Sequence, residues 1–145
     1  GLVYTDKDGQ DKTPVMIHFA LMGSIERFLS VYIEHTAGNF PLWVSPVQVH
    51  FIPVSNEKHV NGAKQFADEL KAVGVRTQVD ASDETVGKKI RKATKQKIPY
   101  IVVVGESDIS GKDWSIRLRG KEEQEMMPKK EFVARLQKEI QDRTK

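Results

Sequence analysis

The sequence predicts an α/β fold in which a mixed sheet of at least four strands is flanked by helices. Residues 47–54 form an apolar, β-branched and aromatic run between Pro46 and Ser55, which is typical of a strand buried on both faces. Residues 99–104 are the most hydrophobic stretch of the chain and predict the central strand. Helical periodicity between these two runs indicates crossover helices beside the sheet, and such crossovers are right-handed.

Five further elements complete this α/β unit in the order β-α-β-α-β-β-α. The first helix ends at Gly74, because glycine adopts the backbone conformation that closes a helix. The other boundaries come from apolar residues that repeat every three to four positions in helices and every second position in strands. The sequence predicts helices at residues 58–73, 83–95 and 128–143 and strands at residues 75–79 and 114–118.

The first 38 residues predict a hairpin followed by one amphipathic helix. The hairpin combines a strand at 2–4, a polar turn at 6–9 and a return strand at 14–18. Ser24 is placed to cap the helix, and Gly38 offers a left-handed end. Because so short a unit buries little surface, we infer that residues 1–38 are the end of a larger domain and that residues 39–145 form a second domain.

Composition limits the classes of function. The chain is 39% apolar and 30% charged, which suits a core with a water-exposed surface. No apolar run reaches the roughly 20 residues of a membrane span, and no signal peptide pattern is present, so we expect a cytoplasmic protein with no membrane partner. The absence of cysteine excludes disulfides, thiolate catalysis and cysteine-ligated zinc within this chain.

Basic residues concentrate on the second predicted helix of the sheet. They are Lys88, Lys89, Arg91, Lys92, Lys95 and Lys97. Lys88, Lys92 and Lys95 share one outward face and predict a phosphate-contacting surface, to which Arg117 and Arg119 add positive charge. Because the acids of this helix lie near its N-terminus, the pattern also fits a solvent-exposed helix that is stabilised by its dipole. The charge pattern alone leaves both interpretations open.

Other chemical signals are weak when each is considered alone. The chain has no Walker-type phosphate loop, no GxGxxG and no nucleophile elbow. His18 ends an apolar run, where a lone histidine is more often a core residue than a metal ligand. The residues Ser24, Glu26 and Arg27 fit a local ion pair in a first helical turn.

Several motifs nevertheless resemble one family. Residues 17–28, IHFALMGSIERF, resemble the third signature motif of threonyl-tRNA synthetases, which are class II aminoacyl-tRNA ligases. Residues 34–49 resemble that family's passage from the catalytic domain to the anticodon-binding domain. Residues 87–91 and 97–105 match later landmarks of the family in the same order.

The resemblance implies roles for three residues of the first 38. His18 corresponds to one of three protein ligands of a zinc ion that binds threonine, Ser24 lies in the amino-acid pocket and Arg27 contacts ATP. The other two zinc ligands and the first two motifs lie upstream in the family, and Phe19 stands where the family usually has arginine. We therefore expect zinc and ATP with magnesium in a homodimeric full-length enzyme, and no tightly bound cofactor or catalysis in this portion alone.

For residues 39–145 the resemblance implies an anticodon-binding domain with a mixed five-stranded sheet and three helices. The residues that correspond to those holding the anticodon loop are Asp83, Arg91, Ser107, Asp108 and Arg117. Polar groups of this kind read the pairing edges of unstacked bases. The family usually has asparagine, lysine and glutamate where this chain has Asp83, Ser107 and Asp108. Lys88, Lys92 and Lys95 add general phosphate attraction.

These observations predict the C-terminal part of a threonyl-tRNA synthetase, which selects threonine tRNA by its anticodon. The full enzyme would attach threonine to this tRNA with ATP. One alternative is a non-catalytic tRNA-binding or assembly module derived from an anticodon-binding domain. Another is a flavodoxin-like binder of a small molecule, which fits the α/β pattern but lacks a phosphate loop.

Overall fold

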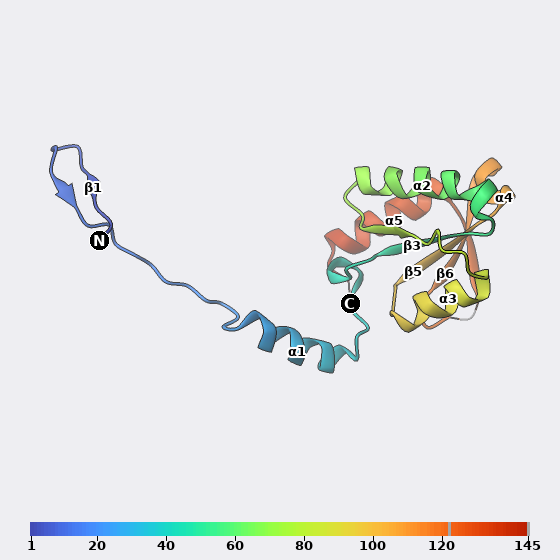
Figure 1. Cartoon of the computed structure of the whole chain (residues 1–145), viewed down its shortest axis with the longest axis horizontal. Coiled ribbons are helices and arrows are strands. Elements are labelled where there is room, and N and C mark those ends of the chain that lie inside the picture. Colours follow the sequence, from blue (N-terminus) through green and yellow to red (C-terminus); the bar gives the residue numbers. More distant parts are fainter. Residues whose placement is uncertain (122, 145) are drawn as a thin grey trace. The chain divides into compact units, whose positions relative to one another are not determined.

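The computed structural model describes residues 1–121 and 123–144. The chain divides into two compact units, Gly1–His35 and Thr36–Lys145, and each is described by itself. Figure 1 shows the elements of both units in sequence colours. Within the described residues, no helix combines the length and the apolar character that a membrane crossing requires.

The first unit contains the predicted hairpin, but its strands are shorter than expected. Strands β1 (Tyr4–Thr5) and β2 (Asp11–Lys12) pair in antiparallel fashion around a turn that contains Gly9 at φ +73°. The predicted return strand at residues 14–18 is wrong, because this stretch has no regular structure. The tight turn brings the return strand forward to β2, and Pro14 then lacks the N–H that would continue the ladder.

Helix α1 (Ile25–Thr36) follows as predicted. The backbone N–H of Arg27 lies 3.4 Å from the Ser24 hydroxyl oxygen, which confirms Ser24 as the cap. Gly38 has φ +75°, the left-handed conformation expected after the helix. None of the residues in α1 is buried, and its apolar side chains Ile25, Leu29 and Ile33 are about half exposed.

The second unit is built on a five-stranded mixed sheet, as the sequence predicted. Its strand order is β4-β3-β5-β6-β7, and β5 is central. Strand β3 runs parallel to β4 and β5, whereas β6 is antiparallel to β5 and β7. The strands are β3 (Val49–Pro53), β4 (Thr77–Val79), β5 (Tyr100–Val104), β6 (Asp113–Leu118) and β7 (Gln124–Pro128).

Helices cover the two faces of this sheet unequally. Figure 1 shows α2 (Asn56–Ala72) and α5 (Lys129–Gln141) on one side of the sheet and α3 (Val86–Lys95) on the other. Every residue of β3 is buried, as the predicted two-sided strand requires. A short 3₁₀ helix, η1 (Leu42–Val44), leads into β3.

The larger core lies between the sheet and the pair α2 and α5. Trp114 of β6 is its centre, because its ring lies 5.6 Å from Phe51, 5.0 Å from Phe66 and 6.0 Å from Phe132. The smaller core on the other face consists of Ile52, Ala93, Ile98 and Ile101. The side-chain alternation along β3 and β5 thus supplies both cores.

Helix α4 (Glu106–Ser110), strand β7 and the 3₁₀ helix η1 were not predicted from the residue pattern. Helix α4 follows β5 directly, and β7 forms an edge strand with alternating exposed and half-buried residues. Helix α4 ends at Gly111, where an added Cβ would lie 2.4 Å from the Ser107 carbonyl oxygen. Helix α3 begins at Val86, so the predicted start at Asp83 is wrong, and Asp83 belongs to the preceding loop.

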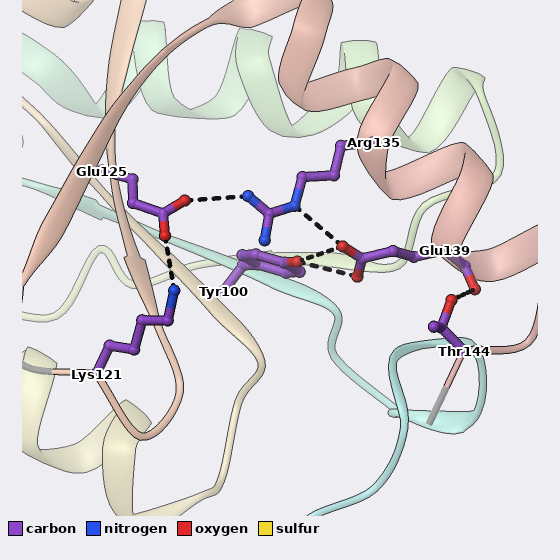
Figure 2. Close-up of polar contacts among 6 residues, drawn as sticks. All are labelled: Tyr100, Lys121, Glu125, Arg135, Glu139 and Thr144. Carbon is purple, nitrogen blue, oxygen red and sulfur yellow. Dashed lines mark hydrogen bonds and ion pairs between the residues drawn. The ribbon is translucent and has the colours of Figure 1, made fainter.

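A polar network ties the central strand β5 and the edge strand β7 to α5 (Figure 2). The Tyr100 hydroxyl donates to the Glu139 carboxylate at 2.9 Å, and Arg135 bridges Glu139 and Glu125 at 3.0 Å each. Lys121 also donates to Glu125 at 2.9 Å. Hydrogen bonds from Lys121 and then from Arg135 lower the pKa of Glu125 below its ordinary value of 4.5, whereas burial raises the pKa of the Tyr100 hydroxyl.

The network predicts an acid-dependent loss of stability. Because the folded state lowers the pKa of Glu125, its ionised carboxylate stabilises the fold above pH 4.5, and this contribution disappears as the pH falls below that value. Glu125→Gln should lower the free energy of unfolding at pH 7 by about 0.2–1 kcal/mol, as for other partly exposed ion pairs.

Urea unfolding of both proteins between pH 3 and pH 7 measures this difference. The difference in the free energy of unfolding between the two proteins should shrink as the pH falls toward 3. Glu123→Gln, which changes an exposed carboxylate two residues away, is the matched control and should show no such trend. A gap that is constant across the range would contradict the assigned role of Glu125.

Candidate nucleic-acid interface

Helix α3 presents the basic face that the sequence predicted. Thr85 occupies the N-cap position, and its carbonyl accepts the backbone N–H groups of Lys88 and Lys89 at 3.0 Å. The outward side chains are exposed and comprise Lys88, Arg91, Lys92 and Lys95. The ammonium of Lys88 also pairs with Glu84 at 2.9 Å. The basic residues of the last turn suit the helix dipole.

Lys89 is an exception to this basic surface. Counting Lys89 with the exposed positive groups is wrong, because its residue is only 2% exposed. Its ammonium lies 3.3 Å from Asn56 Oδ1 and 3.2 Å from the carbonyl oxygen of Asp80. Position 89 falls on the inner side of the helix with Ala93, one turn later, so helical geometry directs it away from solvent.

The loop between β4 and α3 carries Asp83. Its side chain is exposed, and it precedes the N-terminus of α3 by three residues. This position places an acceptor group close to the N-terminus of the basic helix in sequence.

Helix α4 carries two predicted site residues in different environments. Ser107 is exposed, whereas Asp108 is only 8% exposed. The Asp108 carboxylate accepts the backbone N–H of Gly105 at 3.0 Å and that of Ser115 at 3.3 Å. Asp108 therefore ties α4 to β6, and its two oxygens are already engaged by the protein.

Arg117 lies on the part of the sheet that extends beyond α3. The strand register places Arg117 opposite Ile101 and Gln124, and Ser115 opposite Met126. We call Ser115, Arg117, Gln124 and Met126 the open half-face, since these side chains share the α3 face of the sheet and Met126 is 67% exposed. Only Arg117 of this group was predicted as a site residue. The alternation along β6 and β7 identifies the others once β7 is known.

A groove of about 280 Å³ joins the open half-face to α3. Thr94 of α3 and Arg117 of β6 line it together, with Ile98 and Ile101 as apolar lining and Lys121 as a further cation. The structure thus brings Thr94 of the basic helix and Arg117 to one concave surface, and the exposed basic side chains of α3 lie outside its lining. Arg119 also lines this groove, but its guanidinium donates to the carbonyls of Lys97 and Phe40 at 2.9 Å.

The predicted catalytic and metal residues lie in the first unit. His18 is exposed outside regular structure, the Ser24 hydroxyl donates to Glu26 at 2.7 Å, and Arg27 is exposed in the first turn of α1. Across residues 1–121 and 123–144, no group of three His, Asp or Glu side chains is placed to hold a metal ion. His18 by itself does not make a zinc site, because structural and catalytic zinc sites need at least three protein ligands.

A family model described as the anticodon-binding domain matches residues 48–139. The chain belongs to the anticodon-binding domain family. The matched region of this anticodon-binding domain begins just before β3 and ends within α5, so it contains the sheet, α3 and the groove.

Two curated relatives that match this chain are named threonine–tRNA ligases. The chain is 44% identical to a threonine–tRNA ligase of Streptomyces avermitilis over 99% of its length, and 44% identical to that of Petrotoga mobilis over 98%. It spans only 22% of the length of each of these relatives. These matches confirm the resemblance to threonyl-tRNA synthetases that the motifs predicted.

A solved structure supports the same assignment of the fold. The RNA-binding domain of threonyl-tRNA synthetase from Cryptosporidium parvum superimposes with a TM-score of 0.73 at 32% sequence identity. The match covers 82% of this chain and 30% of that chain. The anticodon-binding domain described above therefore has a close structural counterpart.

The two residues on α4 should respond differently to substitution. Asp108→Asn replaces a buried carboxylate oxygen with an amide that faces backbone donors, and it should lower the free energy of unfolding by about 1–3 kcal/mol. Ser107→Ala changes an exposed hydroxyl and should stay within about 0.5 kcal/mol of the unsubstituted protein. Urea unfolding measures both. Equal stability of the two variants would contradict the structural role of Asp108.

Proposed function

We propose that this domain binds threonine tRNA and reads its anticodon on the surface formed by α3, the groove and the open half-face. The observation that supports this proposal is the groove that Thr94 and Arg117 share, with apolar side chains inside and cations around it. Unstacked bases need apolar contact for their faces and polar groups for their edges, and their phosphates need cations. All three kinds of group occur together on this surface.

The residues divide into two roles in the proposal. Asp83, Arg91, Ser107 and Arg117 meet base edges, because each is a polar side chain on the α3 side or at the carboxyl end of β5. Lys88, Lys92 and Lys95 attract phosphates without regard to sequence. Asp108 supports the site by holding α4, which carries Ser107.

We further propose that the longer parent protein attaches threonine to this tRNA with ATP and magnesium. Residues 1–38 are then the end of its catalytic domain and residues 39–145 the anticodon-binding domain. In this proposal His18 supplies one of three ligands to a zinc ion, Ser24 lies in the amino-acid pocket and Arg27 contacts ATP. Bound zinc would hold the amino and hydroxyl groups of threonine. The parent acts as a homodimer in the cytoplasm.

The exposed apolar side of α1 supports this assignment of the first unit. Ile25, Leu29 and Ile33 recur at helical spacing and are each 45–50% exposed. A stripe of this kind is normally covered by another part of a fold. The relatives are more than four times as long as this chain, which leaves ample protein to cover it.

Binding of the chain to threonine tRNA transcripts with native and altered anticodons tests the anticodon proposal. An altered anticodon should weaken binding by more than about tenfold, which is about 1.4 kcal/mol. Arg117→Ala should remove most of this discrimination. Lys88→Ala should weaken binding to all transcripts equally and reduce the slope of log affinity against log salt by about 0.7–0.9.

Lys64→Ala is the matched control, since Lys64 is an exposed lysine on α2, across the sheet from α3. It should change neither discrimination nor the salt slope. If all transcripts bind alike and binding fades with salt, anticodon reading is excluded and a general tRNA-binding or assembly module is the better description.

A further inference from the structure

In the loop before α3, three consecutive backbone carbonyl groups accept hydrogen bonds from two side chains. Asn56, the first residue of α2, donates through Nδ2 to the carbonyl oxygens of Ala81 and Ser82, each at 3.0 Å. Lys89 of α3 donates to the carbonyl oxygen of Asp80 at 3.2 Å. We call Asn56 and Lys89 the loop clamp.

The two members of the loop clamp also bind each other. The Lys89 ammonium lies 3.3 Å from Oδ1 of Asn56, which fixes the orientation of the amide so that its Nδ2 faces the loop. Helices α2 and α3, which pack on opposite faces of the sheet, are therefore linked through one loop. Asp80 stabilises the same loop with its own side chain, because its Oδ1 accepts hydrogen bonds from the backbone N–H and the hydroxyl of Ser82.

Burial of the Lys89 ammonium costs free energy, because the charged group is removed from water. An ammonium that leaves water must be hydrogen-bonded, and both of its hydrogen-bond acceptors here are neutral oxygens. The Asp80 carboxylate lies near enough to interact with it electrostatically and is the opposite charge that partly offsets its burial. Replacing such a buried charge with an apolar residue of similar volume is often neutral or stabilising. The lysine is therefore better explained by the loop that it orients than by the stability of the fold.

We propose that Asn56 and Lys89 are positioning residues that set the orientation of Asp83 for base reading. This inference rests on the proposed anticodon function. Asp83 is exposed and follows directly after the three clamped positions, so the clamp holds the backbone that leads into Asp83. Lys89 is itself buried, so it acts through Asp83 rather than on the RNA.

Two substitutions separate the clamp from the rest of the site. Lys89→Met removes the ammonium and keeps an unbranched side chain that is one heavy atom shorter. Asn56→Asp keeps an acceptor for Lys89 but loses the two hydrogen bonds to Ala81 and Ser82. Both variants should lose at least tenfold in discrimination at one anticodon nucleotide, the one that Asp83→Ala also affects. Their salt slopes should not change, because the exposed lysines remain.

A double-substitution cycle tests whether Lys89 acts through Asp83. Once Asp83→Ala is present, Lys89→Met should cause no further loss of discrimination. Lys88→Ala is the matched control, since this exposed neighbour should weaken binding to every transcript equally and change the salt slope. Circular dichroism and thermal unfolding show which variants remain folded, and Asn56→Asp decides the question if Lys89→Met is unfolded.

The outcomes distinguish this inference from the proposed function. If the unsubstituted domain discriminates and folded clamp variants discriminate equally well, the positioning role is overturned and anticodon reading stands. If the losses from Lys89→Met and Asp83→Ala add in full, Lys89 does not act through Asp83 and the inference also fails. If the unsubstituted domain does not discriminate between anticodons, both proposals are overturned.

Discussion

Among the residues that the structure describes, α3 is the one helix that packs on its face of the five-stranded sheet. Its apolar contacts with Ile52, Ile98 and Ile101 cover the strands near β3 and β5, and β6 and β7 extend beyond them. The opposite face is closed by two helices around Trp114. This unequal cover makes the open half-face and the groove possible, and it places Arg117 beside the basic helix without any separate binding element.

The lysines of α3 differ in solvent exposure, because their positions along the helix direct them to different sides. Lys88, Lys92 and Lys95 stay in water, and in the proposed function their charge attracts phosphates over several ångströms. Lys89, one position from Lys88, is buried and fixes the loop that carries Asp83. In the proposed function, Lys88 attracts phosphates, whereas Lys89 supports base reading. These two residues are neighbours in sequence but lie on opposite sides of α3.

The buried strands and main helices were predictable, because β3 and β5 are continuous apolar runs and α2, α3 and α5 repeat with helical period. Helix α4 is too short for a periodic signal, and β7 is an edge strand with few apolar residues. Arg117 and the basic face were identified from charge and family motifs. The burial of Lys89 and Asp108 depends on partners 33 and 7 residues away, which sequence spacing does not reveal.

Lysine-selective labelling of the domain with and without a threonine tRNA anticodon stem-loop tests the RNA-binding surface most directly. We expect Lys88, Lys92 and Lys95 on α3 to become protected when RNA binds. Lys58 and Lys64, which are exposed on α2, should react as they do without RNA. Protection of the α2 lysines while the α3 lysines stay reactive would contradict RNA binding on the α3 face, because RNA would then bind the face that two helices cover.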